Sequence, residues 1–393
     1  MQAALLQWGS GARASRLLRG HLQPHAEAEA ALAKAAGREA ALLFSSGWAA
    51  NVGLLTALCG PADRIVSDAL NHASLIDAMR LSRAQRVVVD HCDLAAFAAA
   101  LQAPWPGGKT YVVVESVYSM DGDLAPLGPL ASLCAAHNAL LIVDEAHATG
   151  LYGHPDRYGA TGRVEALGLQ DAVLATVHTG GKALGLAGAA VAGPQALIDH
   201  LVNHARSFVF STGLPPVLAA GWTAALAMAA SDRAEVDALH ARAAKLRARL
   251  QHLEQGSRSG SGSGSGAGSG SGSGSGCGSR ETRLTRSLTP PASRLAFGSG
   301  SGSGSGSGHC EPDSHANADS CIIPVVLGSS ARALAVAARL QAQGYDVRAV
   351  RPPTVPEGTA RLRLCVRRSL DDATLSALSD AVVAAVAAET DLT

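Results

Sequence analysis

The first half of the chain repeats one pattern: a short apolar run, a polar loop and then a helical stretch. The pattern is found in "ALLFSSGWAANVGLL", "RIVSDALNHASLIDAMRLS", "RVVVDHCD", "TYVVVESVYSMDGD" and "ALLIVDEAHATG". Apolar strands that alternate with helices predict a mostly parallel sheet that is covered by helices on both faces. Ligands of such sheets bind at the carboxyl ends of the strands. The polar residues expected at those ends are Ser46, Asn71, His72, Glu115, Ser119, Asp144 and His147.

Composition sets wider limits on the class of protein. The 393 residues are enough for about two domains. With 47% hydrophobic residues, 16% charged residues and a formal net charge of zero, the chain gives no electrostatic reason to expect nucleic acid or a membrane as partner. Its apolar segments are interrupted before about 18 residues, so we expect no transmembrane helix and, at the start, no signal peptide. Seven cysteines without CxxC pairs or metal-ligand spacing indicate reduced thiols, no metal site, and a soluble intracellular protein.

The composition changes sharply between Gly256 and Gly308, where Gly-Ser repeats flank the island "CGSRETRLTRSLTPPASRLAF". Such a tract cannot bury enough apolar surface to offset its ordering entropy, so we expect a disordered insertion over 256–308. After it, "CIIPVVLG", "SARALAVAARLQAQG", "YDVRAV", "TARLRLCV" and a final Ala-rich helix indicate a compact α+β unit. We therefore expect a large sheet domain over 1–230 and a small C-terminal domain over 231–393, which the insertion interrupts.

The stretch "TVHTGGKALGLAGAAVAG" places Lys182 among five glycines in an otherwise small and largely apolar setting. Together with the string "DEAH" that begins at Asp144, it suggests an ATPase. An ATPase of this kind needs a phosphate loop of the form GxxxxGK[ST]. The residue six positions before Lys182 is Thr176 and the residue after it is Ala183, so the match fails at both ends.

A site for pyridoxal phosphate fits these residues better. That cofactor needs a lysine for a Schiff base, an acid facing the pyridinium nitrogen, a flat group over the ring and a cradle of donors for its phosphate. Lys182, Asp144 and His72 supply the first three. The donors for the phosphate would be Ser46, Gly47, Trp48 and Thr179. Each residue alone has an ordinary interpretation, such as a surface lysine, a capping aspartate or a structural histidine, but their joint order along the chain favours the cofactor.

Longer strings resemble those of the α-oxoamine synthases, a branch of the fold-type-I pyridoxal phosphate enzymes with the aminotransferase class I/II fold. The matching strings are "NHASLIDAMRLSRA", "ESVYSMDGDLAPL", "LIVDEAHATGLYG", "HTGGKALGLAGAAVAG" and "NHARSFVFSTGLPP". The resemblance extends over nearly all of the chain outside the Gly-Ser tract. Within the family, "VRAVRPPTVPEGTARLRL" is most similar to the branch that makes 8-amino-7-oxononanoate. The preceding N-terminal segment of the family, with a substrate-side arginine, is expected to be missing before "WGSGARASRLLRG".

The resemblance implies a role for each matching position. Lys182 would form the Schiff base, Asp144 would pair with the ring nitrogen, and His147 would contact the ring hydroxyl. His72 would stack on the ring. Thr212 would reach the phosphate in the neighbouring subunit, because family sites form at the interface of a homodimer. The residues that would line or hold the cofactor are Ser46, Gly47, Trp48, Glu115, Ser119 and Thr179.

The activity implied by the resemblance is a decarboxylative condensation of L-alanine with pimeloyl-CoA, which gives 8-amino-7-oxononanoate, CoA and carbon dioxide for biotin synthesis. Arg363 would clamp the amino-acid carboxylate in a charge-assisted fork. Arg351 and Thr354 would lie near the acyl substrate, and His72 would face the substrate as well. The alternatives are a glycine-using synthase (aminoketobutyrate ligase or aminolevulinate synthase), serine palmitoyltransferase, or a non-catalytic homologue that acts as a partner subunit.

Overall fold

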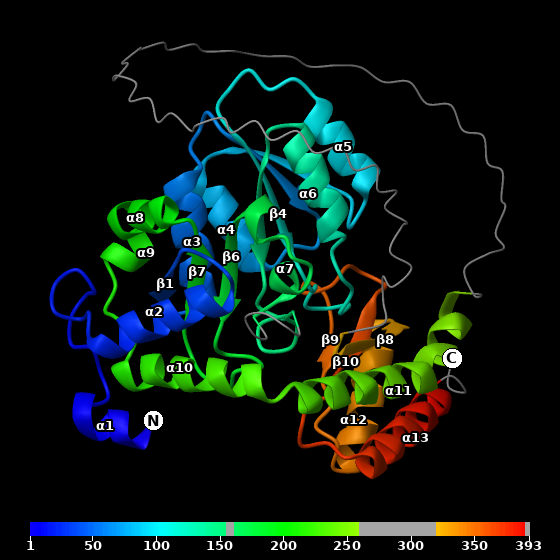
Figure 1. The fold of residues 1–393 in the computed structure, drawn as a ribbon. Helices are drawn as coiled ribbons and strands as arrows, with labels where there is room; N and C mark the ends of the chain where they lie inside the picture. The colour runs from blue at the N-terminus through cyan, green and yellow to red at the C-terminus, as the bar shows by residue number, and fades with distance from the viewer. Residues whose placement is uncertain (155–160, 259–319, 390–393) are drawn as a thin grey trace, which may run out of the picture.

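A computed structural model of the protein describes residues 1–154, 161–258 and 320–389 (Figure 1). Its centre is a seven-stranded sheet with the order β1-β7-β6-β5-β4-β2-β3. The strands are β1 (Ala40–Phe44), β2 (Arg64–Asp68), β3 (Gln85–Val89), β4 (Thr110–Glu115), β5 (Leu140–Asp144), β6 (Val173–Thr179) and β7 (Ala189–Gly193). Strands β2 to β6 are parallel to their neighbours among themselves, whereas β7 runs antiparallel to both β6 and β1. The predicted mostly parallel sheet is confirmed.

Helices cover both faces of this sheet, which explains why its strands read as continuous apolar runs. Tyr111 and Val113 of β4 pack in one core with α3 (Gly47–Leu58), α4 (Ala73–Ser82), α8 (Gln195–His204) and α9 (Arg206–Val209). Val112 and Val114 pack on the opposite face with α5 (Leu94–Gln102), α6 (Leu127–Ala136) and α7 (Arg163–Ala166). A third core joins α2 (Gln23–Ala35) and α10 (Pro216–Ser231) to β1 and β7. A short α1 (Gln2–Trp8) and a 3-10 turn (Gln170–Ala172) complete this part of the chain.

A second, antiparallel sheet has the order β8-β10-β9 and comprises β8 (Ile322–Gly328), β9 (Ala349–Val350) and β10 (Ala360–Cys365). Helices α11 (Arg233–Arg258), α12 (Ser330–Ala342) and α13 (Asp372–Ala388) share its core. Helix α11 follows α10 and leads from the large sheet to the small one (Figure 1). It continues to Arg258, so the first residues of the expected insertion are helical, and the rest of the insertion lies outside the described residues.

The predicted strand "YDVRAV" is wrong over most of its length, because only Ala349 and Val350 pair with β10. Tyr345 donates its backbone N–H to Leu340 at the end of α12, and Val347 donates to Tyr345 in a tight turn. These bonds use groups that a strand would direct to a neighbouring strand.

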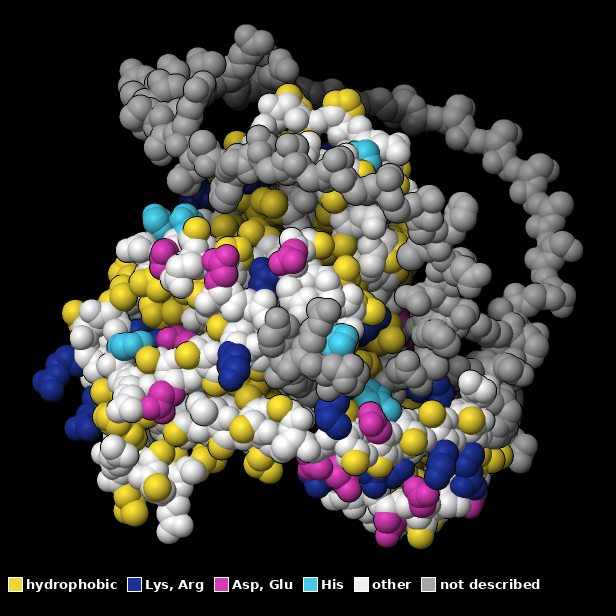
Figure 2. Space-filling model, in the orientation of Figure 1, with side chains coloured by type: hydrophobic (Ala, Val, Ile, Leu, Met, Phe, Trp, Pro, Cys, Tyr) yellow, Lys and Arg dark blue, Asp and Glu magenta, His cyan; other side chains and the backbone are white. Residues whose placement is uncertain are grey.

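The surface of the small domain mixes both signs of charge. On the face in Figure 2, acidic and basic side chains gather together over α11 and α13. There Lys245 pairs with Asp372 at 2.8 Å and Arg249 with Asp380 at 2.7 Å. The five cysteines within the described residues are free thiols, in agreement with the sequence prediction; Cys277 and Cys310 lie outside that range. None of the described helices combines the length and the apolar character that crossing a bilayer requires.

Candidate active site

The carboxyl ends of β5 and β6 bring the predicted lysine and aspartate to one edge of the sheet. Asp144 is the last residue of β5, and Lys182 lies in the loop that reverses the chain from β6 into β7. Gly180 donates its N–H to Gly188 at 2.9 Å and accepts from Leu186 at 2.7 Å, which closes this loop tightly. Parallel neighbours present their carboxyl ends on the same side, so the two residues meet although they are far apart in sequence.

The carboxylate of Asp144 is 5% exposed and is fixed by neutral donors. Asn51, in the middle of α3, donates its amide N–H to Asp144 Oδ2 at 2.8 Å, and the backbone N–H of Ala146 donates to Oδ1 at 2.9 Å. No ion pair to Asp144 occurs among the residues that the structure describes. A buried carboxylate held only by neutral donors is suited to a cationic ligand, because an unpaired buried charge is costly.

Lys182 is exposed to solvent and lines a cavity, but the surrounding protein takes the place of part of the water around its amine. Loss of solvent lowers the pKa of Lys182, although Asp144 and Glu115 oppose that shift. Desolvation and the nearby Lys182 and Arg363 lower the pKa of His147 to about 2, so its ring is neutral. The site therefore favours a neutral imidazole and an amine that deprotonates more readily than a surface lysine.

His72 and Glu115 form a second pair at this edge. His72 is the residue before α4, where its Nδ1 accepts from the backbone N–H of Ser74 at 3.2 Å. Its own backbone N–H donates to Glu115 Oε1 at 2.6 Å. Burial, followed by repulsion from Asp144, raises the pKa of Glu115 to about 8. The carboxyl group of Glu115 is therefore largely protonated at neutral pH.

The expected phosphate cradle lies at the N-terminus of α3, which is 12 residues long. Ser46 caps this helix by accepting from the N–H of Ala49 at 3.2 Å. A Cβ on Gly47 would lie 3.0 Å from Thr179 Cγ2, so Gly47 and Thr179 face each other closely. Unpaired N–H groups at a helix N-terminus favour an anion. Trp48 is 51% exposed and its indole ring borders this end of the helix.

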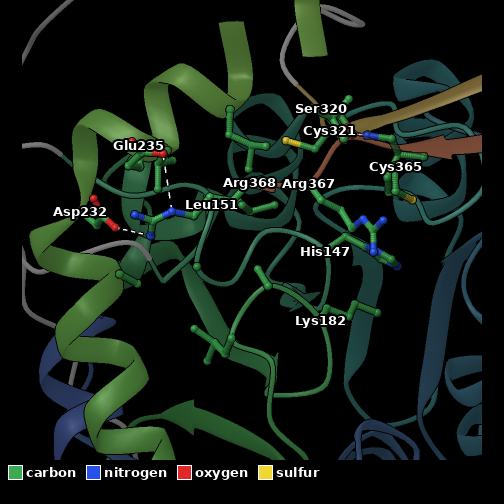
Figure 3. A pocket seen from close by; sticks show the side chains of 18 of the residues that line it. His147, Leu151, Lys182, Asp232, Glu235, Ser320, Cys321, Cys365, Arg367 and Arg368 are labelled. Carbon is green, nitrogen blue, oxygen red and sulfur yellow. Dashed lines mark hydrogen bonds and ion pairs between the residues drawn. The ribbon is translucent and has the colours of Figure 1, made fainter. Parts of the chain in front are cut away.

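Arg363 reaches the site from β10 of the small domain. Its Nε donates to the backbone oxygen of Ser119 at 2.6 Å, and Nη1 lies 2.9 Å from Cys365 Sγ. Together with Lys182 and His147, Arg363 lines a cavity of about 580 Å³ between the two domains. Figure 3 looks into this cavity, with Lys182 and His147 on one wall and Arg367 and Arg368 among the small-domain residues. Its volume is in the range typical of small-molecule sites.

Comparison with known proteins decides the family. The profile of aminotransferase class I and II matches residues 2–262. The chain is 41% identical to 8-amino-7-oxononanoate synthase of Anaeromyxobacter dehalogenans strain 2CP-1, across 98% of this chain and 80% of that protein. The Mycolicibacterium smegmatis enzyme of the same name is 39% identical, across 94% and 79%. The chain belongs to this family. It is therefore a pyridoxal phosphate-dependent acyltransferase with the fold-type-I architecture.

Solved structures support the fold of this family member. Serine palmitoyltransferase of Sphingomonas wittichii superposes with a TM-score of 0.79 at 26% identity, covering 99% of this chain and 82% of that one. The 8-amino-7-oxononanoate synthase of Francisella tularensis superposes with a TM-score of 0.69 at 21% identity, covering 99% and 92%. The residues at this edge of the sheet fit the cofactor of the family: the N-terminus of α3 could hold a phosphate, the buried carboxylate of Asp144 has no ion-pair partner among the described residues, and Lys182 lines the cavity.

Of the predicted site residues, His147, Lys182 and Arg363 line this cavity, and the others do not. Thr212 is exposed, pairs with Ser15 in an isolated bridge, and does not line the cavity. Arg351 and Thr354 are exposed on the loop between β9 and β10, where the N–H of Thr354 bonds to the oxygen of Arg351 at 3.0 Å. Neither residue lines the cavity over Lys182. The sequence reading missed Asn51, whose only signal was a polar side chain in the middle of an apolar helix.

Proposed function

We propose that the protein condenses L-alanine with pimeloyl-CoA, with loss of CO₂ and CoA, to give the 8-amino-7-oxononanoate of biotin biosynthesis. The observation that carries the proposal is that Lys182, His147 and Arg363 line one cavity in a chain whose relatives bear that enzyme name. The cavity supplies an amine and a carboxylate-binding cation, and the fixed acid Asp144 ends the strand two residues before the lining residue Ala146; such a reaction requires these three groups of the protein.

Lys182 and Asp144 would divide the proton chemistry. Bound pyridoxal phosphate supplies an electron sink for the carbanion that forms at the α-carbon of the amino acid. Lys182 would carry the aldehyde of the cofactor in the resting state and, once freed, would take the α-proton at Nζ. Its lowered pKa suits that role. Asp144, oriented by Asn51, would hold a proton at the ring nitrogen.

Arg363 would bind the carboxylate of alanine. Its guanidinium donates two hydrogen bonds, both to neutral acceptors: the backbone oxygen of Ser119 and the sulfur of Cys365. No carboxylate of the described residues pairs with it, so its charge is available for a substrate. Arg368, in the same cavity, is instead neutralised by Asp232 and by Glu235, the latter at 3.5 Å. The acyl thioester would occupy the remaining space towards α11.

A serine-using reaction is the second candidate, because serine palmitoyltransferases superpose with a TM-score of 0.79. Their sequence identity is 25–26%, whereas the curated 8-amino-7-oxononanoate synthases are 38–42% identical. The string "VRAVRPPTVPEGTARLRL", which contains Arg351, Thr354 and Arg363, also resembles the branch that makes 8-amino-7-oxononanoate, and local sequence bears on specificity more directly than overall superposition. We therefore favour alanine and pimeloyl-CoA.

We also propose a homodimer in which Thr212 contacts the phosphate held by the other subunit. Around it the surface exposes large apolar side chains: Phe210 is 71% exposed and, earlier in the chain, Leu18 is 81% exposed. Leu18 and Phe210 flank the isolated bridge between Ser15 and Thr212, so the two apolar side chains belong to paired segments. Exposed apolar groups of this size favour an interface.

The test is a substrate comparison with the purified holoenzyme. Three pairs are offered: L-alanine with pimeloyl-CoA, glycine with acetyl-CoA, and L-serine with palmitoyl-CoA. Release of free CoA and the mass of the amino ketone are measured. We expect turnover with the first pair and none with Lys182→Ala. Turnover confined to another pair would reassign the substrates, and failure to bind cofactor at all would favour the non-catalytic homologue.

A further inference from the structure

Three loops at the carboxyl edge of the large sheet meet at His91, which follows β3. Its Nδ1 lies 2.8 Å from Oδ1 of Asp68 at the end of β2. Its Nε2 lies 2.5 Å from Oδ2 of Asp123, in the loop between β4 and α6. The side chains of His91, Asp68 and Asp123 are 24%, 0% and 19% exposed. The edge of the His91 ring also meets Tyr118, with ring centroids 4.4 Å apart.

The two carboxylates fix the charge of this histidine. An imidazole that faces an acceptor at both nitrogens must donate from both, which only the imidazolium form does. Burial opposes the charge, but the bonds to Asp123 and Asp68 raise the pKa of His91 to about 12. Burial raises the pKa of Asp68, yet the bond from His91 and the backbone N–H groups of Cys92 and Leu70 outweigh it and lower that pKa.

The same residues have the outline of a cation site, because ligand atoms of Asp68, His91 and Cys92 lie within 4.8 Å of one another. A metal needs a lone pair on the imidazole, however. Both nitrogens of His91 are engaged by carboxylates, so the geometry favours an ion-pair cluster instead.

The loop that His91 holds reaches the candidate active site. Val117 and Leu124 pair across its base, and Tyr118 donates its N–H to the oxygen of Asp123 at 3.0 Å. The tip carries Ser119, whose oxygen accepts from Arg363 Nε at 2.6 Å. Next to it, Asp121 forms an ion pair with Arg361, two residues before Arg363 on β10. The loop therefore contacts His91 at its base and the substrate-binding strand of the small domain at its tip.

We propose that His91 is a positioning residue: by pairing with Asp123 it fixes the loop whose Ser119 oxygen orients Arg363 toward the carboxylate of the amino acid. The inference rests on the proposed function to the extent that Arg363 binds that carboxylate. Without the cation, Asp68 and Asp123 repel each other across the vacated space, and the loop between Val117 and Leu124 shifts. Binding of the amino acid then weakens, whereas Asp144 at the end of β5 and Lys182 in the loop after β6 keep their places.

The experiment compares His91→Gln and the milder Asp123→Asn with the wild-type holoenzyme. Affinity for L-alanine is measured without turnover from the absorbance change of the bound cofactor, beside the affinity for pyridoxal phosphate itself. We expect the dissociation constant and KM of alanine to rise about 10-fold. We expect kcat at saturating alanine and cofactor affinity to change by less than about twofold. His91→Lys, which restores a cation, is expected to recover part of the loss.

His137→Gln is the matched control, because this histidine follows α6 and its side chain has no hydrogen bond or ion pair to the described residues. Unchanged alanine affinity in both folded variants would overturn the proposal. Alanine and cofactor affinity falling together would overturn it too, since that marks a general structural role. Stoichiometric zinc retained by the wild type and lost from His91→Gln would replace the ion-pair assignment with a metal site. Because only wild-type turnover tests the reaction, failure of the proposed function is distinguishable from failure of this inference.

Discussion

Replacing Glu115 by glutamine tests the electrostatics of the site without touching its shape. Glu115 is 2% exposed and accepts the backbone N–H of His72 through Oε1 at 2.6 Å. A glutamine oxygen keeps that bond, whereas the carboxylate charge is lost. Burial and then Asp144 raise the pKa of Glu115 from 4.5 to about 8. In the wild type, Glu115 therefore ionises more readily in the unfolded state than in the folded state. The glutamine of the variant does not titrate, so the variant lacks this effect.

The sign and size follow from proton linkage. A raised folded pKa means that the folded state binds the proton more tightly, so this stability is complete below pH 4.5 and is lost as the pH rises through about 8. Each pKa unit corresponds to about 1.36 kcal/mol. When this dependence is integrated from about pH 5 to about pH 7.5, the free energy of unfolding of the wild type falls by about 3 kcal/mol relative to that of Glu115→Gln.

The assay is urea unfolding of the apoprotein at these two pH values, since the bound cofactor would add its own charges. Glu39→Gln is a suitable control, because Glu39 also accepts a backbone N–H, from Gln195 at 2.7 Å, but at an exposed position. A stability difference between wild type and Glu115→Gln that stays constant with pH would mean that Glu115 is ionised throughout. That result would contradict the claim that burial and Asp144 keep Glu115 protonated in the folded protein.

Three further changes address substrate, assembly and cofactor. Arg363→Lys keeps the charge but loses the fork and the bond to the loop oxygen, so KM for L-alanine should rise about 10- to 100-fold with a smaller effect on kcat, in steady-state kinetics. Mixing the inactive variants Lys182→Ala and Thr212→Val should restore about a quarter of the sites if each site draws on both subunits, and no activity if each subunit is self-contained. Gly47→Ala forces a Cβ to 3.0 Å from Thr179 Cγ2, so cofactor affinity, measured by fluorescence titration, should fall about 10-fold while the apoprotein still folds; unchanged affinity would remove the cradle from the helix N-terminus.

The sheet and the centre of the site followed from local pattern and strand topology. Runs such as "YVVV" before Glu115 and "LLIV" before Asp144 are typical of strands that are buried on both faces, as β4 and β5 are here. Once the strands are parallel neighbours, their terminal side chains must share an edge. Lys182 lies at the same edge because the glycines on either side of it permit the tight reversal between β6 and β7. These relations depend on short stretches of sequence and one general topology.

Other parts of the site depend on contacts that no local pattern encodes. Asn51 reads as one polar residue in an apolar helix, and its bond to Asp144 exists only because the fold brings α3 into the same core as β5. Arg351 and Thr354 were predicted near the acyl substrate from the resemblance; neither lines the cavity in the single subunit, and their role stays a prediction. The string "RVVVDHCD" gave no reason to predict a role for His91, because its two partners, Asp68 and Asp123, lie in other loops.

The path of the chain around the Gly-Ser tract explains how the site tolerates it. Before the tract, Arg247 of α11 donates through Nη2 to the oxygens of Ser320 at 2.6 Å and Ile322 at 3.1 Å, where the described chain resumes. Leu246 and Leu250 of the same helix share the core of β8 and β10. The helix before the tract and the strand after it are thus in direct contact. Each doubling of the length between them adds only about 0.6 kcal/mol to the entropic cost of closing the loop. Since β10 carries Arg363, these contacts help to place Arg363 at the cavity that Lys182 also lines.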